Sequence, residues 1–225
     1  MIDNARTVVR RAFVVSGFSR TVAVRLLWMG VILCPAILAA ADRARDLQLR
    51  DVDGGNVKPF ASGAQASVAF FVATDCPVSN AYAPEIQRVC REYRGRGVGC
   101  SLIYEDVEIA HSGLPLRQQV RGHLDEYKFA GIPAAIDGDR AAAAVGKATI
   151  TPTAVVVDRG GAIRYRGRID NLYVALGKTR QQVTSHDLRD ALDAVLAGRP
   201  VPHPETESVG CFITDPALLR THAHE

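Results

Sequence analysis

The stretch Val68-Ala69-Phe70-Phe71-Val72-Ala73-Thr74-Asp75-Cys76-Pro77-Val78-Ser79 decides the fold of this chain. Its first five residues form a continuous apolar run, which is typical of a strand buried on both faces of a sheet. The residues after Cys76 predict a helix whose apolar stripe is Tyr82, Ile86, Val89, Cys90 and Tyr93. Cys76 therefore stands at a helix N-terminus, where backbone N–H groups and the helix dipole favour a thiolate. Nucleophilic or redox sulfur chemistry is the leading hypothesis.

Strands and helices alternate on both sides of this stretch. The turn signal Asp53-Gly54-Gly55 predicts an N-terminal β-hairpin, and Asp158-Arg159-Gly160-Gly161 predicts a second hairpin near the end. Thr184-Ser185-His186-Asp187 fits a capping box at the start of the last helix. The other expected elements are strands at 98–104, 132–136, 154–157 and 163–169, and helices at 116–127, 140–145 and 188–196. This order indicates an α/β sandwich with a central mixed sheet.

Three motifs give the chain a family resemblance: Thr74-Asp75-Cys76-Pro77, Ile132-Pro133-Ala134-Ala135-Ile136-Asp137, and Thr151-Pro152-Thr153 ahead of a strand-turn-strand. With them the chain resembles the extracytoplasmic thioredoxin-like redoxins of the alkyl hydroperoxide reductase/thiol-specific antioxidant superfamily, from Leu47 to Gly198. The resemblance implies a thioredoxin-like three-layer sandwich with an N-terminal β-hairpin. It also implies that Pro152 is cis and faces Cys76, and that Thr151 and Pro152 present backbone to a bound sulfur substrate.

The chain departs from the family pattern around the cysteine. Thioredoxin-like reductases carry Cys-x-x-Cys, whereas the second position here is Ser79, and Asp75 replaces the usual tryptophan. Peroxiredoxins place a threonine three residues before the reactive cysteine, where this chain has Ala73. We expect the helix N-terminus to outweigh the Asp75 carboxylate, so that Cys76 is moderately more acidic than free cysteine. The assignment requires a sulfur at the mouth of the helix and not deep inside.

Residues 1–41 are interpreted as a signal peptide or an N-terminal anchor. Arginines precede an apolar stretch from Leu26 to Leu38, and Ala39-Ala40-Ala41 is typical of a cleavage site. This segment holds five of the 27 Lys+Arg but only one of the 24 Asp+Glu, so the remainder is close to neutral. A neutral domain indicates no nucleic-acid partner. We expect an exported, periplasmic or extracytoplasmic protein, which contacts a membrane only if this segment is uncleaved.

The expected organisation is completed by a redoxin domain at 42–198 and a Pro-rich tail at 199–225 that carries Cys211. A reactive thiol needs a resolving partner, and a tail of this kind can bring Cys211 back to Cys76. Cys211 is therefore the candidate resolving cysteine. The alternative is an exposed spare thiol or a cysteine that pairs with another molecule. Cys90 and Cys100 are interpreted as small apolar core residues, and a bridge between them requires Cα atoms within about 7 Å.

The predicted function is thiol-disulfide exchange or peroxide reduction through Cys76, with a reducing protein or small thiol as partner and no cofactor or metal. One alternative is a copper metallochaperone of the Sco type, in which Cys76, Cys211 and a histidine bind copper. The candidate histidines are His111, His203, His222 and His224. Another alternative is a non-catalytic thioredoxin-fold binding module. The segment 171–183, between the last hairpin and the last helix, is an insertion to which the sequence assigns no role.

Overall fold

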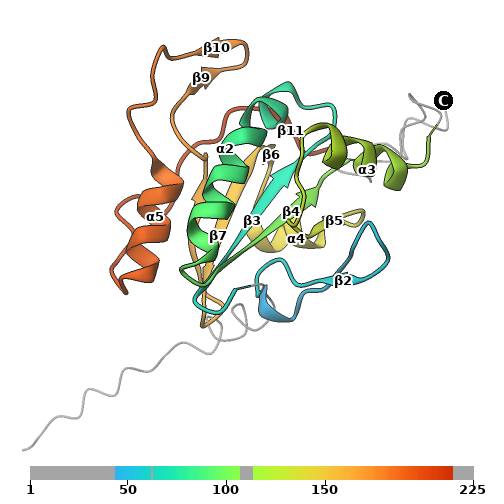
Figure 1. The fold of residues 1–225 in the computed structure, drawn as a ribbon. Coiled ribbons are helices and arrows are strands. Elements are labelled where there is room, and N and C mark those ends of the chain that lie inside the picture. The colour runs from blue at the N-terminus through green and yellow to red at the C-terminus, as the bar shows by residue number, and fades with distance from the viewer. Residues whose placement is uncertain (1–43, 62, 107–113, 215–225) are drawn as a thin grey trace, which may run out of the picture. The chain divides into compact units, whose positions relative to one another are not determined.

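The computed structural model describes residues 44–61, 63–106 and 114–214. The predicted signal peptide or anchor at 1–41 lies outside these ranges. A five-stranded sheet with the order β5-β4-β3-β7-β8 forms the centre of the domain (Figure 1). Its strands are β5 (Ala134–Ile136), β4 (Val98–Tyr104), β3 (Ala66–Val72), β7 (Thr153–Asp158) and β8 (Ile163–Gly167). Strands β3, β4 and β5 are parallel, whereas β7 and β8 are antiparallel to their neighbours. This is the mixed sheet that the sequence predicts.

The central strand β3 is buried along its whole length, as its continuous apolar run predicts. Its alternate side chains enter two separate cores. Val68, Phe70 and Val72 belong to one core cluster, and Ala69 and Phe71 belong to the other. The sheet is therefore covered on both faces, which is why the strand carries no polar alternation.

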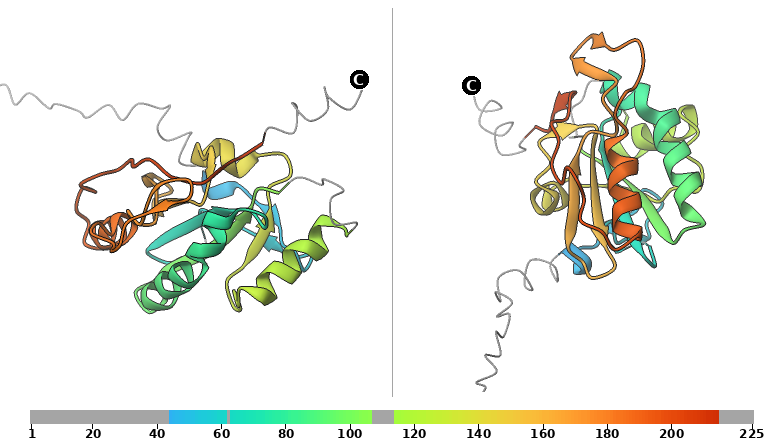
Figure 2. Two further views of the ribbon diagram at one scale, coloured as in Figure 1. Left: turned by 90° about the horizontal axis from the view of Figure 1, so that it is seen from above. Right: turned by 90° about the vertical axis from the view of Figure 1, so that its left-hand side faces the viewer.

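Helices cover the two faces unequally (Figure 2). Helices α2 (Pro77–Arg94), α3 (Leu116–Glu126) and α5 (Asp187–Leu196) contribute side chains to the larger core. Helix α4 (Ala141–Gly146) and the hairpin of β1 (Leu49–Arg50) and β2 (Asn56–Val57) cover the other face. The result is the expected thioredoxin-like α/β sandwich of three layers. No helix in the described ranges is long and apolar enough to cross a membrane.

Two small antiparallel pairs complete the described structure. Strands β9 (Tyr173–Ala175) and β10 (Lys178–Thr179) form a hairpin within the insertion at 171–183. Strand β11 (Cys211–Phe212) pairs with β6 (Ile150–Thr151) just before Pro152. The chain from 204 to 206 bonds to Arg166 of β8 on its way there, so the described part of the Pro-rich tail is packed on the domain.

Two sequence expectations are wrong in detail. Helix α5 begins after His186 without a side-chain cap, because Thr184 is occupied with Asn171: its Oγ1 accepts from Asn171 Nδ2 at 2.7 Å. Cys90 and Cys100 form a disulfide between α2 and β4, with Cα atoms 5.9 Å apart. Both cysteines do point into the larger core as predicted, and it is this shared direction on neighbouring elements that brings their sulfurs together.

Candidate functional site

Cys76 is the N-cap residue of α2, with Pro77 in the first turn. Its sulfur accepts a hydrogen bond from the backbone N–H of Ser79 at 3.5 Å. Its thiol donates to the carbonyl oxygen of Thr151 at 3.2 Å, across 75 residues of sequence. The Cys76 sulfur thus caps the start of α2 and also forms a hydrogen bond with β6. The predicted position at a helix N-terminus is confirmed.

The Thr151–Pro152 peptide bond is cis, as the resemblance implied. Cys211 lies opposite Thr151 in the β6–β11 pair, and the Thr151 hydroxyl donates to the Cys211 carbonyl oxygen at 3.5 Å. The Cys211 side chain is close enough to Cys76 to lower the pKa of the Cys76 thiol. The structure therefore brings all four predicted residues together: Cys76, Cys211, Thr151 and Pro152.

The two thiols have opposite acid strengths. Burial raises the pKa of Cys76, but hydrogen bonds to its thiolate from Cys211, Ser79 and Thr151 outweigh burial, and the pKa ends lower than that of a free cysteine. Burial, together with the hydrogen bond and charge of Cys76, raises the pKa of Cys211 to about 12. Cys76 is consequently the thiol that ionises, and Cys211 stays protonated as its hydrogen-bond donor.

Cys76 is 0% exposed, so the expectation that its sulfur would not lie deep inside is wrong. Gly210 and Cys211 lie against Thr151, the residue whose carbonyl oxygen accepts from the Cys76 thiol. A Cβ atom at Gly210 would lie 2.7 Å from the carbonyl carbon of Thr151, so only glycine allows this close approach. Cys211 itself is partly exposed. Cys211 is therefore the more accessible of the two cysteines.

Ser79 occupies the place of the second cysteine in the Cys-x-x-Cys pattern. Ser79 is 2% exposed, and its hydroxyl has no hydrogen-bond partner among the described residues. The same hydroxyl lowers the pKa of Cys76, which places it as a donor to the thiolate. A buried hydroxyl without a partner costs free energy, and ionisation of Cys76 supplies the missing acceptor. Ser79 thus favours the charged sulfur.

A buried hydrogen-bond network holds the loop before Cys76. Asp106 accepts from the backbone N–H of Thr74 at 2.9 Å and from its hydroxyl at 2.6 Å. Asn80 donates to the Thr74 carbonyl at 3.1 Å and accepts from His123 Nε2 at 2.8 Å. His123 Nδ1 accepts from the Tyr104 hydroxyl at 2.9 Å. Burial lowers the pKa of His123 to about 4, so the ring is neutral and fits both contacts.

Sequence analysis missed this network, although a signal for it exists. His123 stands three residues after Val120 and four before Tyr127, which places it on the apolar stripe of the helix at 116–127. A histidine on a buried stripe needs partners for both ring nitrogens. The strand end at Tyr104 and the helix start at Asn80 provide them.

The insertion at 171–183 borders the same end of the sheet. Tyr173 packs against Tyr82 of α2, with ring centroids 5.6 Å apart, and the Tyr82 hydroxyl donates to the Asp170 carboxylate at 2.6 Å. The hairpin carries Val174 and Leu176 exposed to solvent, and Phe212, next to Cys211, is 81% exposed. Apolar side chains thus stand in solvent on both of these segments.

No group of three His, Cys, Asp or Glu side chains in the described ranges gathers as a metal site. His203 is exposed and lines a pocket beside α5 with Asp187 and Pro202, separate from the two thiols. His111, His222 and His224 lie outside the described residues. No observation on the described part of the chain therefore favours the copper alternative.

Comparisons with known proteins support the fold. No protein-family model matches the chain, and no curated protein matches it. Among solved structures, the chain is similar to a hypothetical protein from Sinorhizobium meliloti, with 28% identity and a TM-score of 0.64 over 76% of this chain and 91% of that one. An uncharacterized conserved protein from Geobacillus kaustophilus is 26% identical with a TM-score of 0.63, over 75% and 87% of the two chains. A secreted disulfide oxidoreductase of Mycobacterium tuberculosis, homologous to E. coli DsbE, is 15% identical with a TM-score of 0.46, over 70% and 98%.

Proposed function

We propose that this protein is an extracytoplasmic thiol-disulfide oxidoreductase of the redoxin type, in which Cys76 is the nucleophile and Cys211 is the resolving cysteine. One observation carries the proposal. Two free cysteines, 135 residues apart in sequence, meet at the N-terminus of α2, and the one at the helix start has the lower pKa. A helix N-terminus with several hydrogen-bond donors is the environment of a reactive thiolate, and a second thiol in reach completes a two-electron pair.

The reaction follows from these two acid strengths. The Cys76 thiolate attacks one sulfur of a substrate disulfide, the substrate S–S bond breaks, and the other substrate sulfur leaves as a thiolate. Cys211 then loses its proton and attacks the Cys76 sulfur, which forms the Cys76–Cys211 disulfide and releases the second substrate thiolate. With a peroxide the first product is a Cys76 sulfenic acid and an alcohol or water, and Cys211 converts the sulfenic acid to the disulfide with loss of water. An external dithiol protein or small thiol reduces the pair again.

The pKa of Cys211 falls during the cycle at the step in which Cys211 must attack. The thiolate of Cys76 contributes to the raised pKa of Cys211 through a hydrogen bond and through its charge. Once Cys76 is bonded to substrate sulfur it carries no charge, and those two contributions vanish. Cys211 then ionises more readily, at the step that needs its thiolate.

The Cys90–Cys100 disulfide supports an oxidising compartment, because disulfides persist mainly in exported proteins. This agrees with the interpretation of residues 1–41 as an export segment. The division into a leader, a redoxin domain at 42–198 and a tail at 199–225 remains part of the proposal. Sequencing the N-terminus of the protein recovered from a periplasmic extract tests both the export and the cleavage.

The deciding experiment measures turnover of an insulin-type disulfide and of a peroxide, each with a dithiol reductant. We expect turnover with at least one of them, its loss in Cys76→Ser, and a trapped mixed disulfide on Cys76 in Cys211→Ser. A non-reducing peptide map after mild oxidation should contain a Cys76–Cys211 linked pair. Stoichiometric copper binding without turnover would support the metallochaperone, and partner binding that survives Cys76→Ser would support the non-catalytic module.

A further inference from the structure

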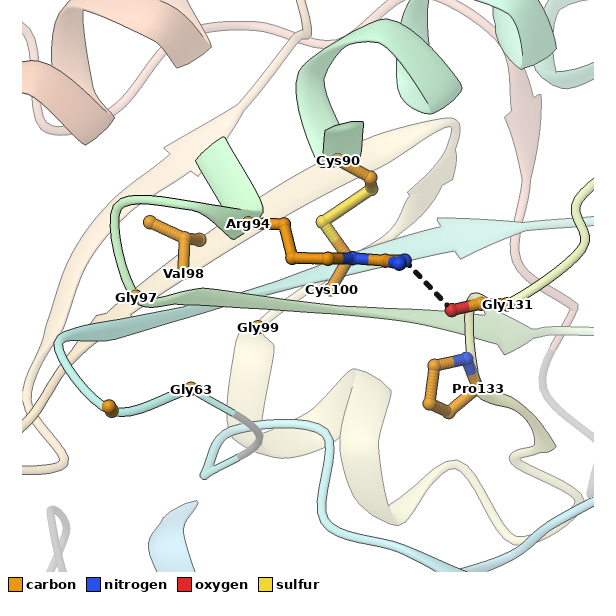
Figure 3. Close-up of a pocket in the computed structure, with 10 residues that line it drawn as sticks. Gly63, Cys90, Arg94, Gly97, Val98, Gly99, Cys100, Gly131 and Pro133 are labelled. Atoms are coloured by element: carbon orange, nitrogen blue, oxygen red, sulfur yellow. Dashed lines mark hydrogen bonds between the residues drawn. A yellow bond between two sulfur atoms is a disulfide. The ribbon is translucent and has the colours of Figure 1, made fainter. Parts of the chain in front are cut away.

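A second sulfur centre lies at the far end of α2, where the Cys90–Cys100 disulfide opens into a pocket of about 320 Å³ (Figure 3). Cys90 is 14 residues after Cys76, which is about 21 Å along a helix. The pocket therefore does not belong to the Cys76 site. We propose that the Cys90–Cys100 disulfide is a separate thiol-exchange centre and that it takes a small thiol carrying carboxylates.

The pocket exists because β4 extends beyond β5. Pairing between these strands begins at Leu102, so the residues of β4 before it, which include Cys100, pair with β3 on one side and have no described strand on the other. The walls next to the disulfide include Gly97, Gly99 and Gly131, which present backbone without side chains. A small molecule can thus approach the sulfurs more closely than side chains would allow.

The two sulfurs differ in access. Cys90 is 2% exposed on the buried stripe of α2, whereas Cys100 is partly exposed at the strand edge. Cys100 is the less buried residue of the pair, so an incoming thiolate attacks its sulfur, and the Cys90 sulfur becomes the leaving group. The incoming thiolate forms a bond with Cys100 Sγ, the Cys90–Cys100 bond breaks, and its electron pair stays on Cys90 Sγ as a thiolate. A second thiolate can then attack the mixed disulfide, which leaves a dithiol in the protein and a disulfide of the small thiol.

Arg94 carries a positive charge that favours both the incoming anionic thiol and the departing Cys90 thiolate. It stands one helical turn after Cys90, on the same side of α2, and lines the same pocket. Its guanidinium donates to the carbonyl oxygen of Gly131 at 3.0 Å (Figure 3) and forms no ion pair with any carboxylate in the described ranges. A cation without a protein counter-ion attracts an anionic thiol, and next to Cys90 it stabilises the departing thiolate.

The test uses the full chain with Cys76→Ser and Cys211→Ser, so that the proposed active site is silent. Glutathione is the probe, and mass spectrometry of peptides follows its mixed disulfide on Cys100. We expect Cys100 to be modified in the folded protein and Arg94→Ala to slow the reaction about fivefold, with Arg94→Lys close to the parent. The cationic thiol cysteamine, compared at equal thiolate concentration, should react more slowly than glutathione and be insensitive to Arg94→Ala.

Two results would overturn the proposal. One is a disulfide that glutathione modifies only when urea unfolds the protein, because the bridge is then a structural link and nothing more. The other is equal rates for glutathione and cysteamine in the parent and in Arg94→Ala, because the pocket then selects no charge. Neither result bears on the Cys76 chemistry, since both active-site cysteines are absent from the test protein.

Discussion

Replacing Gly210 by alanine tests whether β11 controls access to Cys76. The added Cβ would clash with the Thr151 carbonyl oxygen and lie 2.7 Å from the carbonyl carbon, where ordinary contact begins at 3.4 Å. Strand β11 must therefore move away from β6, because the nearest atoms belong to the backbone of Thr151. Crowding of this kind costs about 1–3 kcal/mol, which here is lost from the pairing that closes the site. The open state then becomes roughly 5- to 150-fold more populated, because a tenfold change corresponds to about 1.4 kcal/mol.

The assay follows alkylation of Cys76 by iodoacetamide in the reduced protein, with peptide mass mapping to separate it from Cys211. When opening and closing are fast compared with alkylation, the rate is proportional to the open population, so Gly210→Ala should accelerate modification of Cys76 by the same factor. Formation of the Cys76–Cys211 disulfide should slow at the same time, because the two sulfurs are held apart.

Gly138→Ala is the matched control, since a Cβ there meets nothing within 4 Å. It should leave both rates unchanged, and circular dichroism should show the same fold in both variants. The reasoning is refuted if Gly210→Ala is folded and Cys76 reacts no faster than in the parent. It is also refuted if Cys76 of the parent already reacts as fast as it does in the unfolded chain, because the sulfur is then not covered.

Four further outcomes follow from the described contacts. Ser79→Ala should raise the pKa of Cys76, because it removes a hydrogen bond to a charged sulfur, whereas Ser101→Ala, at a buried serine bonded to Pro59, should leave it unchanged. The ultraviolet absorbance of the thiolate against pH measures this. Phe212→Ala should lower kcat/KM about tenfold for a protein disulfide and leave a small disulfide unaffected, since an exposed aromatic side chain beside Cys211 is a contact that only a large partner covers. His123 has a pKa of 6.5 in the unfolded chain and about 4 in the folded protein, so the unfolded chain binds the proton first as the pH falls. The free energy of unfolding should therefore decrease as the pH drops from 6.5 toward 4. His123→Gln should flatten this part of the pH profile measured by denaturant unfolding. Replacing both Cys90 and Cys100 by alanine should cost about 2.5–3 kcal/mol of unfolding free energy in urea titrations, because the bridge closes a loop across a sequence separation of 10.

Hydrophobic periodicity predicted most of the fold. It placed the buried strand β3, the apolar stripe of α2 and the strand β4, because each depends on which residues of one element are apolar. The position of Cys76 at a helix start was predictable for the same reason, since Pro77 fixes where the helix begins.

Features that depend on two distant segments were not predictable in this way. The sequence showed that Cys90 and Cys100 both face the core, but not that a helix and a strand bring them within bonding distance. It showed a glycine at 210, but not that this glycine lies against Thr151. Thr184 and Ser185 have the composition of a helix cap, yet Asn171 binds both, through a Thr184 side-chain bond and through their backbone N–H groups. In each case a tertiary contact determined the outcome and local preference did not.

Cys76 and Cys90, one from each cysteine pair, lie toward opposite ends of α2, and this position determines how well each can carry a thiolate. Cys76 lies at the positive end of the helix dipole and receives several hydrogen bonds, so its thiolate, and with it the reduced form of the Cys76–Cys211 pair, is stabilised. Cys90 lies near the opposite end, where the dipole disfavours a thiolate and Arg94 is the cation that can offset it. A stabilised thiolate makes a disulfide easier to reduce, and about 1.4 kcal/mol corresponds to about 30 mV for this two-electron couple. The helix thus favours a thiolate at Cys76 over a thiolate at Cys90.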